Sequence, residues 1–186
     1  MFIETEQTPN PASLKFLPGC EVMLRGTAEF ADASAAASSP LAEELFKING
    51  VSGVFLGGDF VTVTKSADAE WTRLRPMIMG VIMQHFTSGR PVMLNENAGF
   101  TNTSSASDHD SDIVRQIKEI LDTRVRPVVA ADGGDIVFAD FTDGVVYLHM
   151  RGACAGCPSS TMTLKTGIEN LLKHFIPEVN EVRAAN

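Results

Sequence analysis

The chain has 186 residues, of which 44% are hydrophobic and 20% charged, and its formal net charge is −8. This length fits one ordinary domain or two small ones, and the longest apolar stretch, Met77–Met83, is far too short to cross a bilayer. Because the basic residues are scattered singly along an acidic chain, the composition argues against nucleic acid and against an anionic membrane surface as partners.

The N-terminus and the cysteine content together predict a cellular setting. The first eleven residues contain two acidic and no basic side chains, which is not expected of a secretory signal or of an Arg-rich transit peptide. Three cysteines without an export signal argue against a disulfide framework. We therefore expect a reducing, cytoplasmic location.

The first part of the chain is predicted to mix strands and helices. Ser39 and Pro40 mark a helix start, with Ser39 as the N-cap. A second helix is expected to follow Asp68 as its cap and to kink or divide at Pro76. Short β-rich runs between turn residues predict strands at Leu14–Leu17, Val22–Leu24, Val51–Leu56 and Phe60–Thr64. This part of the chain offers no catalytic constellation.

A change in composition separates the two parts of the chain. Residues 95–112 read NENAGFTNTSSASDHDSD, which is small, polar and acidic. Such a segment cannot bury enough apolar surface to offset the entropy of ordering it. We therefore predict a flexible linker over residues 90–110, a first domain over residues 1–89 and a second domain over residues 111–186.

The second domain is predicted to run helix, strand, strand, helix, strand. A cap at Ser111 or Asp112 begins the first helix, which must stop or bend at Pro127. Asp143-Gly144 is a strong signal for a two-residue hairpin turn. The second helix is expected at Pro158–Phe175, and the strands are expected at Ile136–Phe141, Val145–Met150 and Val179–Val182. The whole chain is thus predicted to be α+β, with two small domains and, in the second, helices over one sheet face.

Cys154 and Cys157 are the candidate site residues. They lie in the run RGACAGCPSS, in a loop between a strand and the N-terminus of a helix. Gly152 and Gly156 allow backbone N–H groups to approach the two sulfurs, and the positive end of the helix dipole favours thiolate over thiol. We therefore expect this loop to hold two low-pKa thiolates at the surface.

Two thiols at this spacing leave three chemistries open. A thioredoxin-type redox pair also precedes a helix, but no aromatic residue directly precedes Cys154 here. A zinc site needs two further ligands, for which His149 and His174 are available, although His149 shares a strand face with Tyr147. Two chains meeting about a two-fold axis would instead supply four thiolates to an iron–sulfur cluster.

Other conspicuous residues are interpreted as structural. Cys20 lies far upstream without a nearby partner and is expected to be an incidental surface thiol. Asp132 and Asp135 flank a Gly-Gly pair, which is typical of a turn rather than of a cation site.

Several motifs give the chain a resemblance to a known family. Its second half resembles the C-terminal domain of NifU-like (Nfu-type) iron–sulfur proteins at Asp132–Asp135, Asp143–Leu148 and Gly152–Ser160. Its first half resembles the Nfu N-terminal domain at Gln7–Ala12, Leu14–Gly19 and Ile48–Val51. The resemblance covers nearly the whole chain except the predicted linker.

This resemblance implies a scaffold or carrier and not an enzyme. A 4Fe–4S cluster would bind between the two subunits of a homodimer and pass to apo iron–sulfur target proteins, with upstream cluster assembly proteins as further partners; a 2Fe–2S form is the alternative. Neither a membrane nor nucleic acid is implied. Only Cys154 and Cys157 carry over as ligands, and no residue carries over as catalytic.

Overall fold

The computed structural model describes residues 1–95, 111–155 and 158–185. The chain divides into two compact units, Met1–Thr101 and Asn102–Asn186. Their helices and sheets confirm the predicted mixed fold with two small domains. Each helix within the described ranges is too short or too polar to span a membrane.

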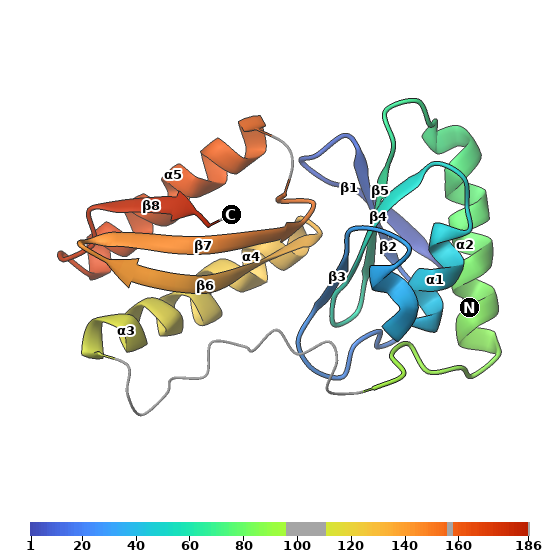
Figure 1. Ribbon diagram of the computed structural model, residues 1–186, viewed down its shortest axis with the longest axis horizontal. Coiled ribbons are helices and arrows are strands. Elements are labelled where there is room, and N and C mark those ends of the chain that lie inside the picture. Colours follow the sequence, from blue (N-terminus) through green and yellow to red (C-terminus); the bar gives the residue numbers. More distant parts are fainter. Residues whose placement is uncertain (96–110, 156–157, 186) are drawn as a thin grey trace. The chain divides into compact units, whose positions relative to one another are not determined.

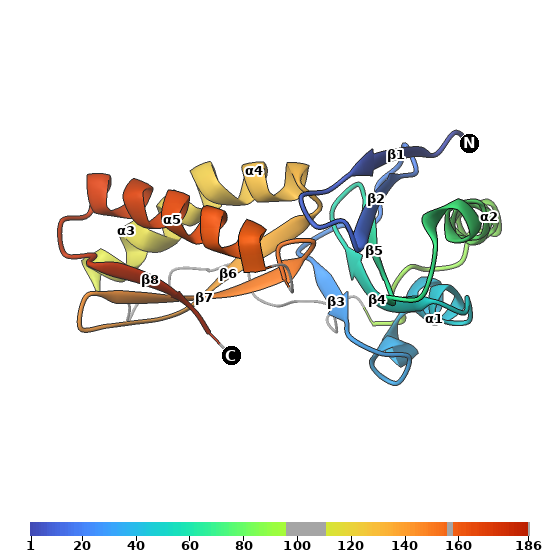
Figure 2. The ribbon, with the colours of Figure 1, turned by 90° about the horizontal axis from the view of Figure 1, so that it is seen from above.

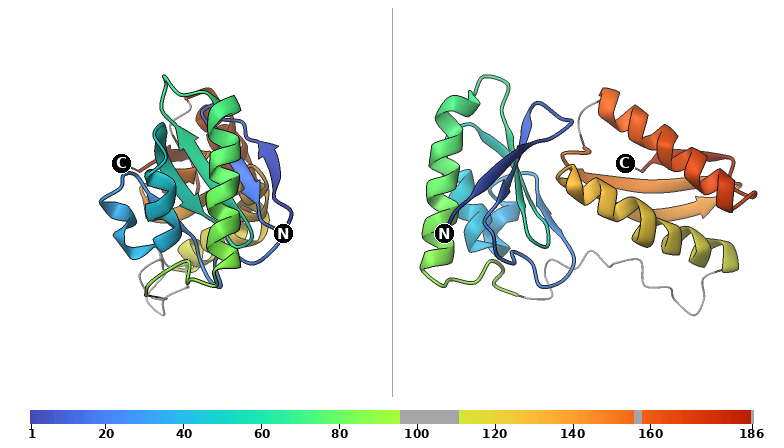
Figure 3. Two further views of the ribbon diagram at one scale, coloured as in Figure 1. Left: turned by 90° about the vertical axis from the view of Figure 1, so that its right-hand side faces the viewer. Right: turned by 180° about the vertical axis from the view of Figure 1, so that it is seen from behind.

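The first unit is an antiparallel sheet of five strands with two helices on one face (Figures 1 and 3). The helices are α1 (Pro40–Phe46) and α2 (Trp71–Thr87), and a short 3-10 turn, Ala35–Ser38, precedes α1. In sheet order the strands are β1 (Glu4–Gln7), β2 (Ser13–Leu17), β5 (Val61–Lys65), β4 (Val51–Leu56) and β3 (Ala28–Phe30).

The start of α1 confirms the predicted cap. The Ser39 hydroxyl accepts a hydrogen bond from the Ala42 amide at 3.2 Å and donates one to the Val92 carbonyl at 2.6 Å. Pro40 occupies the first turn, where its missing N–H costs nothing.

Helix α2 differs from its prediction at two points. It begins at Trp71 with Glu70 in the cap position, so Asp68 is not its cap. It also runs unbroken through Pro76. A single lost hydrogen bond is tolerated because one apolar face of the helix is buried against the sheet, through Leu74, Ile78, Ile82 and His85.

The strand predicted at Val22–Leu24 is absent from the described structure, while strands β1 and β3 were not predicted. The amides of Val22 and Met23 both donate to the carbonyl of Gly58, at 2.7 and 3.1 Å. This stretch is therefore a loop bound to the turn between β4 and β5. Its backbone N–H groups are satisfied by a turn carbonyl and not by a neighbouring strand.

The second unit places its helices on one face of a three-stranded sheet, as predicted (Figure 2). Strand β7 is central, antiparallel to β6 and parallel to β8. Asp143 and Gly144 both have positive φ, 53° and 79°, and close the predicted hairpin. The elements are α3 (Asp112–Ile120), α4 (Arg126–Ala131), β6 (Gly134–Thr142), β7 (Val145–Gly152), α5 (Pro158–Phe175) and β8 (Glu181–Ala184).

The bend predicted at Pro127 is a π-helical turn, Leu121–Val125, between α3 and α4. Pro127 cannot donate to the carbonyl four residues before it, and the wider turn accommodates the missing donor without ending the helical path. Strand β8 also lies two residues later than the predicted Val179–Val182.

The residues before the gap at 96–110 belong to the first unit. Val92 and Met93 pack on its core, and the Leu94 amide donates to the Ser38 carbonyl at 2.9 Å. The predicted linker therefore includes residues that pack on the core of the first unit and bond to the turn before α1. Its remainder lies outside the described residues. The proposed domain boundaries stay predictions.

Candidate functional site

The candidate site is the loop that joins β7 to α5. Strand β7 delivers the chain to Gly152, whose φ of 63° turns it away from the sheet. The structure describes the loop as far as Ala155 and resumes the backbone at Pro158. Cys154 is therefore described, whereas its predicted partner Cys157 lies outside the described residues.

The Cys154 side chain points into the second unit. The residue is only 7% exposed and belongs to the core cluster beneath α5. Its sulfur lies against strand β6 at Gly134, where a β-carbon would come within 2.5 Å of Sγ and 2.7 Å of the Arg151 carbonyl oxygen. The sulfur thus occupies space that a side chain at position 134 would fill.

Two hydrogen bonds hold the main chain on both sides of this thiol. The Thr161 hydroxyl, from the first turns of α5, donates to the Cys154 carbonyl at 3.0 Å. The Ala153 amide donates to the Gly133 carbonyl at 3.2 Å. The loop is therefore tied both to the helix that follows it and to the turn before β6.

The prediction of low-pKa thiolates at the surface is wrong for Cys154. Burial raises the pKa of this thiol to about 12, and the negative charges of Asp132 and Asp135 act in the same direction. The position of the loop before α5 predicts sulfurs that face the helix N-terminus and solvent. Instead, the hairpin brings Cys154 inward, and for Cys157 the expectation remains a prediction.

Asp135 does more than form a turn. Its carboxylate is buried and accepts two hydrogen bonds from Arg126, through Nε and Nη2, both at 2.9 Å. Arg126 also reaches Asp122 at 3.3 Å. This ion pair joins the start of α4 to β6 beside the cysteine loop, and sequence reasoning missed it because it depends on how the helix packs on the strand.

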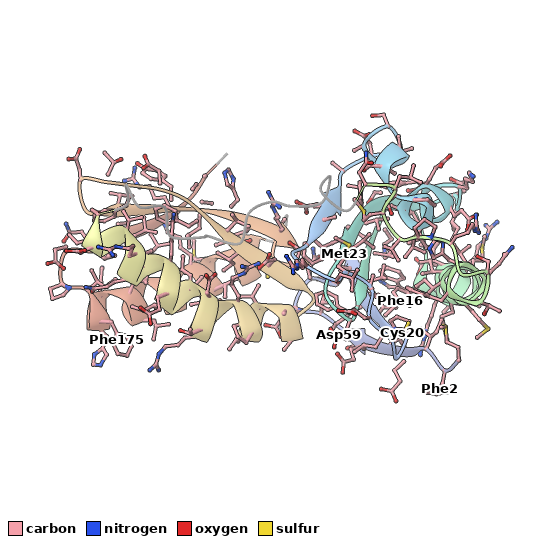
Figure 4. All side chains as sticks on the ribbon, turned by 90° about the horizontal axis from the view of Figure 1, so that it is seen from below. Phe2, Phe16, Cys20, Met23, Asp59 and Phe175 are labelled. Atoms are coloured by element: carbon pink, nitrogen blue, oxygen red, sulfur yellow. The ribbon has the colours of Figure 1, made fainter. Side chains whose placement is uncertain are left out.

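The other candidate ligands do not join Cys154 in the described part of the chain. His149 pairs with Val137 in the ladder of β6 and β7, and His174 stacks edge-on against Phe175 at 5.0 Å near the end of α5. No group of three or more His, Cys, Asp or Glu residues able to hold a metal occurs among the described residues. Cys20 lies in the first unit, after β2, and is partly exposed (Figure 4).

Comparison with known proteins decides the family. The family described as "Scaffold protein Nfu/NifU N terminal" matches residues 3–89, and the "NifU-like domain" matches residues 117–183. NifU-like protein 5, mitochondrial, from Arabidopsis thaliana is 50% identical over 98% of this chain and 67% of its own length. The chain belongs to the NifU-like (Nfu) family of iron–sulfur scaffold proteins.

Further relatives of this Nfu protein agree. NifU-like protein 4, mitochondrial, from Arabidopsis thaliana is 50% identical, and the NFU1 iron-sulfur cluster scaffold homolog, mitochondrial, from Drosophila sechellia is 51% identical. Each aligns with 98% of this chain, which spans 64–65% of their length. The solution structure of a NifU-like protein from Saccharomyces cerevisiae aligns with 51% of this chain and 86% of its own, with 27% identity and a TM-score of 0.44.

These relatives overturn one prediction. The cytoplasmic location inferred from the acidic N-terminus is contradicted, because the relatives at 50–51% identity are named mitochondrial proteins. A targeting signal is a short segment separate from the folded domains. The composition of the first residues of this sequence is therefore a weak guide to the compartment of the protein.

Proposed function

We propose that two copies of this chain bind one 4Fe–4S cluster between them and transfer it to apo iron–sulfur proteins. Cys154 and Cys157 of each copy are the ligands, and 2Fe–2S is the alternative cargo. The proposal rests on one observation: the Cys-x-x-Cys loop has two thiols, and no further cluster of ligands completes a site among the described residues. Four thiolates then require two loops.

The division of ligands between two subunits suits transfer. Each chain holds the cluster by half of its ligands, so the thiolates of an acceptor can replace one pair while the other pair still binds. Cluster binding requires each thiol to lose its proton, and the buried state of Cys154 means that it must also leave its contact with Gly134.

The remaining parts of the proposal follow from the same chemistry. A carrier of this kind needs no catalytic residue, and its partners are a second copy of the chain, the apo acceptors and the proteins that supply the cluster. The mitochondrial names of the relatives favour that organelle as the place of transfer. Residues 111–186 would carry the cluster, and residues 1–89 would serve partner recognition.

Anaerobic reconstitution tests the function. The full chain is incubated with iron and sulfide, and iron and acid-labile sulfide are counted per chain together with the molecular mass in solution. We expect about two irons and two sulfides per chain in a dimer, since a 4Fe–4S cluster takes four thiolates. Cys154→Ser and Cys157→Ser should each abolish both cluster loading and dimer formation.

Cys20→Ser is the matched control, because it removes a thiol from the other unit and should leave loading unchanged. A monomer that keeps a complete cluster would contradict the shared site. A protein that binds zinc alone, or that reduces disulfides with turnover and binds no iron, would favour the zinc or the redox interpretation instead.

A further inference from the structure

Gly134 and Cys154 touch although twenty positions separate them. The register of β6 and β7 opposes Gly134 to Gly152, so the chain that leaves β7 folds back over the start of β6. There the Cys154 sulfur takes the place of a side chain on Gly134, at 2.5 Å from where a β-carbon would lie. Any other residue at position 134 would collide with the thiol.

The loop cannot relieve such a collision by moving as a whole. The Thr161 hydroxyl holds the Cys154 carbonyl, and the Gly133 carbonyl holds the Ala153 amide. The Arg151 carbonyl oxygen lies 2.7 Å and the Cys154 amide nitrogen 3.1 Å from the same β-carbon position. A side chain at position 134 would therefore displace both the thiol and the backbone next to it.

The strand beneath the thiol is also held in place. The residue after Gly134, Asp135, is fixed by the two hydrogen bonds from Arg126, which anchor the start of β6 to α4. A buried two-bond ion pair of this kind resists displacement, because moving either group leaves a charge without its partner. Gly134 thus presents a rigid, side-chain-free surface to the sulfur.

We propose that Gly134 is a positioning residue that gives Cys154 a sheltered resting place in the cluster-free protein. The sulfur lies against this glycine when no cluster is bound, turns outward to reach iron, and returns after transfer. The inference rests on the proposed function, since it assigns a role in cluster binding to the outward position. It adds a residue outside the cysteine loop to the site and explains why the carrier's thiol is buried.

Alkylation of Cys154 in metal-free protein tests the inference. The full chain with Cys20→Ser and Cys157→Ser retains one thiol, and its reaction with iodoacetamide is followed by mass spectrometry. We expect Gly134→Ala to speed labelling by about tenfold or more, because a β-carbon in this tight contact displaces the sulfur and the backbone that carries it. Gly167→Ala is the matched control, since a β-carbon there meets nothing within 4 Å.

Each protein is labelled at a temperature the same number of degrees below its own midpoint of thermal unfolding. A variant that is merely less stable overall then does not appear to expose Cys154 locally. Labelling of a folded Gly134→Ala protein at the parental rate would overturn the inference. If that variant does not fold, a comparison of thiols in the folded chain decides. Cys154 as the one remaining thiol should react about tenfold slower than Cys20 as the one remaining thiol, and equal rates would overturn the sheltered position.

The two proposals fail separately in these experiments. Alkylation involves no iron, so its outcome is the same whether or not the wild-type chain loads a cluster. Failure of reconstitution would contradict the proposed function, whereas the alkylation rates would still show whether Gly134 shelters Cys154. An unchanged alkylation rate in a chain that does load a cluster would remove the positioning role alone.

Discussion

The carboxylate of Asp135 and the guanidinium of Arg126 are both largely shielded from solvent, with side-chain exposures of 5% and 16%. A charge pair in which both side chains are this buried differs from the other described ion pairs, each of which has at least one considerably more exposed partner and contributes less. The importance of Asp135 therefore lies in what its removal would leave behind.

Asp135→Asn should destabilise the second unit by about 2 kcal/mol, because the buried Arg126 guanidinium loses the carboxylate that accepts two of its hydrogen bonds and keeps only Asp122 at 3.3 Å. Urea unfolding followed by circular dichroism measures the change. Asp140→Asn, at an exposed position of the same strand, is the control and should cost little. Equal effects of the two substitutions would show that the Arg126 pair is solvated in practice.

His85 is the second residue whose effect on the free energy of unfolding can be tested. Its side chain is fully buried on α2, and neither ring nitrogen makes a hydrogen bond of normal geometry to a described residue. Burial lowers the pKa of His85, the charge of Arg90 acts in the same direction, and Glu44 opposes them. The folded chain thus holds this imidazole neutral at a pH where the unfolded chain would protonate it.

The stability of the first unit should therefore fall as the pH drops below about 6.5, the ordinary pKa of histidine. In that range the unfolded chain binds a proton at His85 that the folded chain does not, so the free energy of unfolding falls by up to about 1.4 kcal/mol per pH unit until the lowered pKa is reached. Urea unfolding at several pH values measures it.

His85→Leu should remove that part of the pH dependence, whereas His174→Gln, at an exposed position of the other unit, should leave it intact. A His85→Leu protein with an unaltered slope between about pH 6.5 and pH 5 would assign the dependence to other groups.

At the scale of elements, local signals were sufficient wherever a few neighbouring residues determine the structure. The cap at Ser39 and the hairpin at Asp143-Gly144 were both predicted, because each depends on contacts within four residues. Strands β1 and β3 were missed because they are short and depend on pairing with distant neighbours.

For the candidate site, too, local sequence predicted some features, whereas others depend on tertiary contacts. The motif identified Cys154 from its neighbours in sequence, and the resemblance supplied its chemistry. Its burial, its contact with Gly134 and the Arg126–Asp135 pair depend on the β6–β7 register and on how α4 packs, which no local pattern encodes. Tertiary contacts therefore decided the state of the thiol.

At the scale of the whole molecule, the chain builds two separate cores. One forms between the five-stranded sheet and helices α1 and α2, and the other between the sheet of β6, β7 and β8 and the helices α3, α4 and α5. Each unit can therefore satisfy its own apolar surface, as expected of independent domains.

Residues 111–186 alone should fold and load a cluster with the stoichiometry of the full chain, while residues 1–95 alone should fold and bind no iron. Circular dichroism and iron and sulfide analysis of the two fragments measure this. An unfolded C-terminal fragment would show that its core needs the first unit.

The parallel pairing of β8 with β7 has a consequence for proteolytic trimming. Strand β8 covers one side of β7, and the Ala185 amide extends this cover by donating to the Leu148 carbonyl at 2.8 Å. Removal of these residues would make β7 an edge strand with unpaired backbone amides and carbonyls. Such an edge can pair with a strand of another chain and start aggregation. The C-terminal residues thus protect β7, the strand that leads to Cys154, from pairing with other chains.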